Sequence, residues 1–185
     1  MTEQKTPNIV IEKMKPERFR LVHEAIVETS EELFATGMLS RPQISIDEHE
    51  NWTKEIFELW ELDQLYTFHV LDASTNQFVG VVQISHVNRA YQMANLSYWV
   101  RASRAGEGIA TIAVNLVARY CFEKLNFHRI EIIVSKENAT SLRVAEKLGA
   151  VREGLLRNRL QLHGSPCDAY MHSLIPKDFE INNAA

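Results

Sequence analysis

Apolar and polar positions alternate with two distinct periods along this chain, and the two periods predict both strands and helices. A period of two residues indicates a strand with one buried face, and a period of about 3.6 indicates an amphipathic helix. The predicted strands cover residues 8–14, 66–71, 78–85, 94–100, 128–135, 151–162 and 168–175. The predicted helices cover residues 16–29 and begin near residues 45, 109 and 138. A meander of strands followed by a crossover helix requires a mixed sheet with helices on its faces.

Several predicted helix ends carry residues that satisfy backbone groups left free by a helix. Pro16 suits a first turn, where its missing N–H would have no partner. Ser45 and Glu48 have the spacing of a capping box, and Asn138 is a typical N-cap. Gly149 suits the end of the helix that Asn138 begins. The expected apolar stripe of the second helix consists of Trp52, Ile56, Leu59 and Trp60.

Length and composition favour one folded domain. The chain has 185 residues, of which 45% are hydrophobic and 24% charged, so it contains enough apolar material for a core. We expect a single domain over residues 1–185, with flexible ends at residues 1–7 and 178–185. Cys121 and Cys167 are too few for a disulfide scaffold and are expected to be two buried, free thiols.

Charge and hydropathy exclude two classes of partner. The 20 basic and 24 acidic residues give a formal net charge of −4, which disfavours nucleic acid as a partner. No stretch approaches the roughly 18 apolar residues of a membrane span, and the first residues form no signal peptide. We therefore expect a cytoplasmic protein that binds neither nucleic acid nor membrane. No spacing of His, Cys, Asp and Glu suggests a metal site.

The segment after the fourth predicted strand carries the chemistry. Gly106 and Gly108 stand where a strand leads into a helix, and without a Cβ they allow close approach of a large anion. The free N–H groups of the helix N-terminus favour phosphate or pyrophosphate at this place. A dinucleotide-binding fold would need a third glycine where Thr111 stands, and a carboxylate where the next strand ends in Ser135 and Lys136. A nucleotide-dependent redox enzyme is therefore disfavoured.

The chain resembles the GNAT superfamily of N-acetyltransferases. That family has a Gln/Arg-x-x-Gly-x-Gly/Ala loop that binds the pyrophosphate of coenzyme A. Gly108 and Ala110 match its last two positions, Gly106 matches a common extra glycine, and Ala105 stands in place of Gln or Arg, with Arg104 one residue earlier. Residues 138–141 and 146–150 also resemble the family. Residues 96–100 and 153–154 are most similar to the branch that acetylates the N-terminal serine or alanine of ribosomal proteins.

This resemblance implies an α+β fold and a set of coenzyme contacts. The implied fold is a single domain of α/β/α layers around a mixed, mostly antiparallel sheet of about seven strands with a splayed central pair. Acetyl-CoA is the implied acetyl donor. The implied contacts with it are Trp99, Val100, Arg101, Arg104, Ala105, Gly106, Glu107, Gly108, Ile109, Ala110, Thr111, Asn138 and Ser141.

Acetyl transfer needs a donor for the developing oxyanion and a proton for the departing thiolate. The resemblance implies that the backbone near Trp99, Val100 and Arg101 supplies the donor and that Ser141 is the catalytic acid. Ser141 could instead satisfy a backbone group in the first turn of its helix, and Asn138 could be an N-cap as well as a coenzyme contact.

The general base is not identified by the sequence. Leu160 stands where the ribosomal branch carries a glutamate, and four substitutes remain unranked: His86, His163, His172 and Tyr170. At pH 7 an α-amine of pKa about 7.7–8.0 is already roughly a tenth neutral, whereas only about one lysine amine in 2,500 is. A site without a strong base therefore suits a protein N-terminus.

The sequence thus predicts an N-acetyltransferase whose acceptor is the N-terminal amine of a protein such as a ribosomal protein. Two alternatives stay open: an acetyltransferase of small amines (a polyamine, an amino sugar or a toxin), and a non-catalytic module that binds coenzyme A. A homodimer is also left open. A basic cluster could bind an acidic partner or the 3′-phosphate of the coenzyme. This cluster consists of Arg143, Lys147, Arg152, Arg157 and Arg159.

Overall fold

A computed structural model describes residues 6–181, and the expected flexible residues 1–5 and 182–185 lie outside this part. The strands are β1 (Ile9–Lys13), β2 (Tyr66–Asp72), β3 (Gln77–Asn88), β4 (Met93–Val100), β5 (Arg129–Ser135), β6 (Val151–Leu162) and β7 (Ser165–Leu174). The α-helices are α1 (Phe19–Glu28), α2 (Ser30–Ala35), α3 (Ile46–Glu61), α4 (Ile109–Lys124) and α5 (Ala139–Lys147). Three short 3-10 helices are η1 (Pro16–Arg18), η2 (Ala102–Arg104) and η3 (Pro176–Phe179). Every predicted strand and helix is present, and α2 is an additional short helix.

The strands form one seven-stranded sheet in the order β1-β2-β3-β4-β5-β7-β6. Strands β4 and β5 pair in parallel, and the other neighbouring pairs are antiparallel. The crossover helix α4 makes the parallel pair possible, because it returns the chain to the same end of the sheet. The α+β architecture with a mixed, mostly antiparallel sheet is confirmed.

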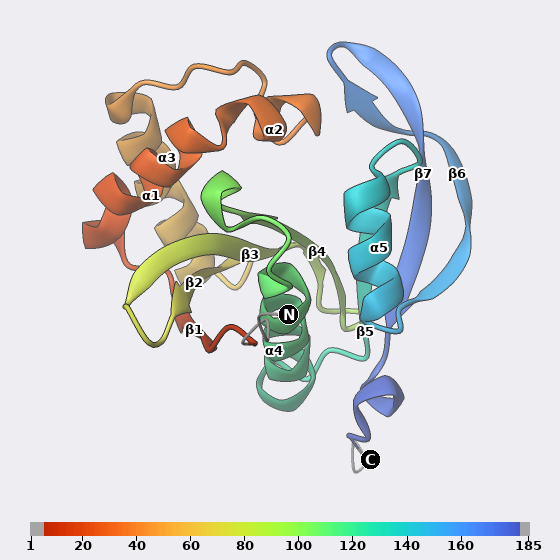
Figure 1. Cartoon of the computed structure of the whole chain (residues 1–185). Coiled ribbons are helices and arrows are strands. Elements are labelled where there is room, and N and C mark those ends of the chain that lie inside the picture. The colour runs from red at the N-terminus through yellow and green to blue at the C-terminus, as the bar shows by residue number, and fades with distance from the viewer. Residues whose placement is uncertain (1–5, 182–185) are drawn as a thin grey trace, which may run out of the picture.

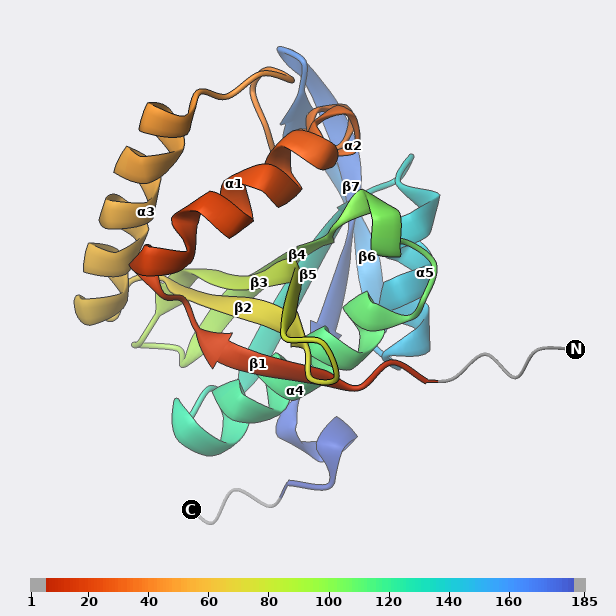
Figure 2. The ribbon, with the colours of Figure 1, turned by 60° about the vertical axis from the view of Figure 1, so that its left-hand side comes forward.

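Helices cover both faces of the sheet (Figures 1 and 2). On one face, α4 packs its buried side chains against apolar residues of β1 to β5 in the larger core. On the opposite face, α1 packs in a second core that includes Leu71, Phe78 and Val81. In Figure 2, α1 and α3 lie together on that side, away from α4. Side chains alternate along each strand, so neighbouring residues belong to different faces.

The start of α3 forms as predicted, but the buried side of this helix differs from the prediction. Ser45 accepts a hydrogen bond from the Glu48 N–H at 3.2 Å, and Glu48 accepts one from the Ser45 N–H at 3.0 Å. Of the expected apolar stripe, Trp60 packs against the larger core, and Ile56 and Leu59 are half-buried. Trp52 is 41% exposed, whereas His49 and Thr53 are buried. The prediction was wrong for Trp52 because the sequence does not specify the rotation of α3 over a sheet face that itself carries polar residues.

The packed part of the chain extends further towards the C-terminus than expected. Residues 178–181 were assigned to a flexible end, yet Phe179 in η3 is buried in the larger core. Its ring lies edge-on to Phe122 of α4, with 5.3 Å between the ring centroids. Cys121 and Cys167 are both free thiols, as expected, but only Cys121 is buried. Cys167 is half-buried because it lies in the outer hairpin of β6 and β7.

Candidate active site

Gly106 and Gly108 shape the loop that joins β4 to α4. Both have a φ of +82°, in the left-handed region that residues with a Cβ rarely adopt. A Cβ added at either position would meet no heavy atom within 4 Å. The backbone conformation of the loop, and not crowding, therefore favours glycine at these two positions.

This loop presents a row of free backbone donors, which we call the amide row: the N–H groups of residues 106 to 111. Within residues 6–181, none of these N–H groups donates a hydrogen bond to another part of the chain. The first backbone bond into α4 runs from the N–H of Ile112 to the carbonyl of Gly108, at 3.2 Å. The donors of the first helical turn add a partial positive charge. The amide row is thus suited to bind an anion such as a pyrophosphate.

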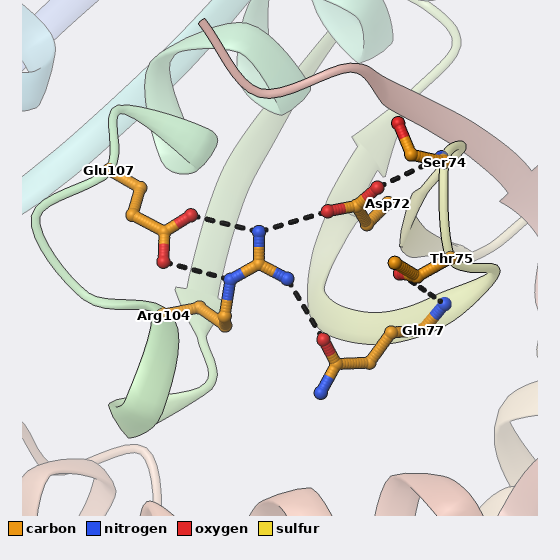
Figure 3. Close-up of polar contacts among 6 residues, drawn as sticks. All are labelled: Asp72, Ser74, Thr75, Gln77, Arg104 and Glu107. Carbon is orange, nitrogen blue, oxygen red and sulfur yellow. Dashed lines mark hydrogen bonds and ion pairs between the residues drawn. The ribbon is translucent and has the colours of Figure 1, made fainter. Parts of the chain in front are cut away.

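Arg104 holds this loop against the hairpin formed by β2 and β3 (Figure 3). Its Nη2 lies 3.0 Å from Asp72 Oδ2, and its Nη1 lies 2.9 Å from Gln77 Oε1. Its Nε and Nη2 each lie 2.8 Å from an oxygen of Glu107. These bonds raise the pKa of Arg104 and lower the pKa of both carboxyl groups. The side chains of Arg104 and Glu107 thus bind each other and the hairpin, and the Arg104 N–H donates to the carbonyl of Arg101 at 2.9 Å. The N–H of Glu107 stays free, so this residue remains a predicted coenzyme contact through its backbone.

The end of α1 anchors the other side of the same loop. Glu28 forms an ion pair with Arg101 and accepts a hydrogen bond from the Ser103 N–H at 2.8 Å. Hydrogen bonds from Ser103, with Arg101 beside them, lower the pKa of Glu28 to about 2. The Ala102 N–H donates to the hydroxyl of Thr29 at 3.0 Å. Sequence analysis missed Glu28 and Thr29, since they precede the loop by more than 70 residues.

Strands β4 and β5 separate beside this loop, as the splayed central pair of the prediction required. They pair only from Met93 to Asn95 and from Arg129 to Glu131, and then continue to Val100 and Ser135 without pairing. We call the space between residues 96–100 and 132–135 the β4–β5 opening.

Backbone groups of β4 line one side of the β4–β5 opening. The Arg101 N–H donates to the carbonyl of Val79 in β3 at 2.9 Å. Because the bonds of an antiparallel ladder alternate, the N–H of Trp99 also points to β3, and those of Tyr98 and Val100 point into the opening. Of the three residues predicted to supply an oxyanion donor, Val100 alone directs its N–H there.

Helix α5 begins at the other side of the β4–β5 opening. Asn138 is its N-cap, as predicted, and its Oδ1 accepts a hydrogen bond from the Ser141 N–H at 3.0 Å. The hydroxyl of Tyr98 in β4 donates to the carbonyl of Ser141 at 3.3 Å, which links the two sides of the opening. The half-buried Ser141 makes no side-chain hydrogen bond within the described part of the chain. Its hydroxyl is therefore not used to satisfy a backbone group, and it remains available.

The predicted substitutes for a general base are dispersed. Exposed His86 has a ring nitrogen 3.1 Å from the hydroxyl of Ser85. His163 lies in the β6–β7 turn and packs against Phe34, with 4.3 Å between the ring centroids. Burial lowers the pKa of His172, which pairs with Ile132 and so shares the face covered by α4.

Tyr170 and Leu160 belong to the outer hairpin of β6 and β7. The guanidinium of Arg152 lies 3.2 Å from the centre of the Tyr170 ring. Leu160 pairs with Cys167 beside an irregular part of β6. The structure therefore does not single out any of these residues as the base.

This chain is similar in sequence to proteins of a known family. The family model described as "Acetyltransferase (GNAT) domain" matches residues 8–151. The chain belongs to the GNAT acetyltransferase family. The family is one of acyltransferases that use acetyl-CoA, as the motif around Gly108 predicted.

Two similar proteins are N-acetyltransferases by name, and the name of only one of them states an acceptor. The "Probable N-acetyltransferase YjcK" of Bacillus subtilis is 35% identical over 127 residues, which cover 68% of this chain and 70% of that protein. The spermidine N(1)-acetyltransferase of Escherichia coli is 31% identical over 122 residues, which cover 61% of this chain and 66% of that protein. The relatives establish N-acetyl transfer and leave the acceptor undetermined.

Two solved structures share the fold. The ribosomal-protein-S5-alanine acetyltransferase of Vibrio fischeri has a TM-score of 0.79 and 23% identity, covering 91% of this chain and 93% of its own. The spermidine N-acetyltransferase of Vibrio cholerae, solved with CoA and spermine, has a TM-score of 0.80 and 21% identity. That match covers 94% of this chain and 98% of the Vibrio cholerae chain. At these identities the likeness concerns the fold.

In this GNAT enzyme, a polar cluster that sequence analysis missed lies on the sheet face opposite α4. Arg129 contacts Glu131 at 2.8 Å and both oxygens of Glu153 at 2.7 and 2.6 Å. The hydroxyl of Ser173 donates to Glu153 at 2.7 Å, and hydrogen bonds from Arg129 and Ser173 lower the pKa of Glu153 to about 2. Asn95 pairs with Glu131, and its buried Oδ1 has no partner within residues 6–181. One signal in the sequence could have revealed part of this cluster. Glu131 stands between the apolar residues Ile130 and Ile132, which are buried under α4, so its side chain must lie on the opposite face of the sheet.

The predicted basic cluster lies on α5 and on β6, the strand that follows it in the chain. All five of its side chains are exposed, and among the described residues none of them forms an ion pair with a carboxylate. Arg152 covers the ring of Tyr170, as noted above. Arg143 and Lys147 add positive charge to the helix that carries Ser141, whereas Arg157 and Arg159 belong to β6.

Within residues 6–181, no group of three or more His, Cys, Asp or Glu side chains could hold a metal ion. None of the helices in this part of the chain has the length and apolar character needed to cross a membrane.

Proposed function

We propose that this N-acetyltransferase acetylates the N-terminal amine of a protein, with a ribosomal protein as the first acceptor to test. The observation that carries this proposal is the state of two carboxylates at the paired ends of β4 and β5, on the sheet face opposite α4. Glu131 and Glu153 are both bound by Arg129, and Leu160 stands where the ribosomal branch carries a glutamate. Because Arg129 neutralises them, Glu131 and Glu153 are poorly suited to act as a strong base or to bind a polycation.

The acceptor's own pKa decides how much a base is needed. About a tenth of α-amines are neutral at pH 7, so a protein N-terminus can attack without help from a strong base. A lysine or polyamine amine, neutral in only about one molecule in 2,500, requires a base that takes its proton. The fold shared with a ribosomal-protein acetyltransferase agrees with this choice.

Three groups of the chain act in the proposed mechanism. The amide row binds the pyrophosphate of acetyl-CoA, which supplies the acetyl thioester. The N–H of Val100 donates to the thioester carbonyl oxygen as negative charge develops there. The amine forms a C–N bond as the C–S bond breaks, Ser141 gives its proton to the departing thiolate, and the proton lost by the amine returns through water to the Ser141 oxygen.

A direct comparison of acceptors tests the proposal. Release of the coenzyme thiol is measured with a peptide that has a free N-terminus, with the same peptide N-formylated and carrying an internal lysine, and with spermidine. We expect activity on the first peptide and loss of at least nine-tenths of it on the formylated one. Equal activity on both peptides would contradict the proposal.

Spermidine is the second candidate acceptor, because a spermidine acetyltransferase is 31% identical over 122 residues. Activity on spermidine with none on either peptide would select this alternative.

A further inference from the structure

The hydroxyl of Tyr98 joins the two sides of the β4–β5 opening, and the mechanism above does not use it. Tyr98 lies in β4, and its side chain packs against the larger core, as does that of Leu142 in α5. The Tyr98 hydroxyl donates to the carbonyl of Ser141, which follows it by 43 residues. The bond thus connects β4 with the residue of α5 that is proposed to protonate the departing thiolate.

This hydrogen bond matters because the two strands are not paired at this level. The parallel pairing of β4 and β5 ends at Asn95 and Glu131. Within residues 6–181, no other hydrogen bond connects residues 97–100 with residues 133–141. The separation of the two sides of the opening therefore depends on packing and on the hydroxyl of Tyr98.

Ser141 is held through both of its backbone groups. Its N–H donates to Oδ1 of Asn138 at 3.0 Å, which fixes the first turn of α5 relative to the residue that precedes the helix. Its carbonyl accepts the bond from Tyr98 at 3.3 Å, which fixes the same turn relative to β4. Of these two partners, Tyr98 is the one that sets the position of Ser141 across the opening.

The same strand carries the proposed oxyanion donor. Tyr98 and Val100 are two residues apart in β4, and both are paired with β3, at Val82 and Gly80. The bond from Tyr98 therefore connects the strand that holds the Val100 N–H to the helix that holds the Ser141 hydroxyl. Proton transfer requires heavy atoms about 2.6–3.2 Å apart, so a small shift of α5 away from β4 would slow it.

Tyr98 does not supply the proton itself. Burial raises the pKa of its phenol, so the group is protonated at neutral pH. Its proton is directed to the carbonyl of Ser141 and not to a reacting atom. Any contribution of Tyr98 to the reaction is therefore made through Ser141.

We propose that Tyr98 is a positioning residue for acetyl transfer: its hydroxyl holds the first turn of α5 so that the Ser141 hydroxyl and the Val100 N–H act on the same thioester. This inference rests on the proposed mechanism, in which Ser141 protonates the thiolate. It does not depend on the identity of the acceptor, because both groups act on the coenzyme.

The first test is Tyr98→Phe, which removes the hydroxyl and keeps the ring in the core. Thiol release is measured with whichever acceptor the wild type acetylates, the peptide with a free N-terminus or spermidine. We expect kcat to fall about three- to tenfold, which corresponds to the loss of one hydrogen bond. The KM for acetyl-CoA should change less than about twofold, because the amide row keeps its donors. An unchanged kcat would show that the proposal is wrong.

Tyr66→Phe is the matched control. Tyr66 in β2 is buried, and its hydroxyl accepts a hydrogen bond from Arg89. Strand β3 separates β2 from β4, so this hydroxyl lies away from the opening. Both variants should have a lower Tm, but Tyr66→Phe should keep the wild-type kcat. An equal loss of kcat in both variants would show a general loss of stability and contradict the positioning role.

A double substitution shows whether Tyr98 acts through Ser141. In a Ser141→Ala background, Tyr98→Phe should change kcat less than about twofold, because the hydroxyl that it positions is absent. Effects that multiply would overturn the proposal. If Ser141→Ala alone leaves kcat unchanged, the proposed mechanism fails and the role of Tyr98 fails with it. If spermidine is acetylated and the peptide is not, the proposed acceptor is wrong, whereas the result for Tyr98 still stands.

Discussion

Replacing Gly108 by alanine should weaken the binding of acetyl-CoA through backbone conformation alone. The φ of this residue is +82°, and a Cβ would meet nothing within 4 Å, so the substitution introduces no clash. An alanine in the left-handed region costs roughly 1–2 kcal/mol. Stiffening of the unfolded chain by alanine offsets about 0.4–1 kcal/mol of this, which leaves roughly 0.5–1.5 kcal/mol.

This free-energy cost can be detected as a lower Tm or as a higher KM for acetyl-CoA, depending on whether the loop keeps its conformation. If the loop keeps its conformation, the chain loses stability, and its Tm should fall by about 1–6 °C, because a chain of this size loses about 2–4 °C per kcal/mol. If the loop relaxes instead, the amide row must be restored when the coenzyme binds. The KM for acetyl-CoA should then rise about two- to tenfold, since 1.4 kcal/mol corresponds to about a factor of ten.

Gly149→Ala is the matched control. Gly149 follows the C-terminal end of α5, has a φ of +72°, and also has open space where its Cβ would be. It should lose a similar amount of stability with no change in the KM for acetyl-CoA. An equal rise in KM for both variants, or an unchanged KM and Tm for Gly108→Ala, would refute the reasoning.

Three further predictions follow from the same contacts. Ser141→Ala should lower kcat at least tenfold with less than a twofold change in the KM for acetyl-CoA; unchanged kcat in a thiol-release assay would remove Ser141 from the mechanism. Asp72→Asn weakens the hold on Arg104 and should raise the KM for acetyl-CoA several-fold at constant kcat, whereas a change in kcat alone would contradict a positioning role. Burial lowers the folded-state pKa values of His49 and His69 to about 4, below the unfolded value of 6.5, so the unfolded chain binds more protons between these values. The Tm should therefore fall as the pH is lowered from 6.5 to 4, and His69→Phe should reduce that slope; an identical slope would show that His69 does not contribute.

Features that depend on neighbouring residues could be predicted from the sequence. The strands follow from period-2 alternation, and the capping box of Ser45 and Glu48 depends on residues three apart. The N-cap role of Asn138 and the positive φ of Gly108 are likewise properties of a few adjacent residues. The sequence could also locate the loop between β4 and α4, because that loop is recognised from the neighbouring residues Gly106 and Gly108.

Contacts between distant segments could not be predicted in this way. Arg104 joins the loop to Asp72 and Gln77, which belong to a hairpin about 30 residues earlier in the chain. The grouping of Arg129 with Glu153 depends on β7 lying between β5 and β6, an order that no local pattern specifies.

The sequence by itself determined which segments become strands and helices and where a glycine loop leaves backbone N–H groups free, because periodicity, capping and glycine conformation act over a few residues. Only the tertiary structure decided that Val100, and not Trp99 or Arg101, directs its N–H into the β4–β5 opening. It also decided that the hydroxyl of Tyr98 reaches the carbonyl of Ser141. Both results depend on strand register and on which faces pack together, and these are settled by the whole sheet at once.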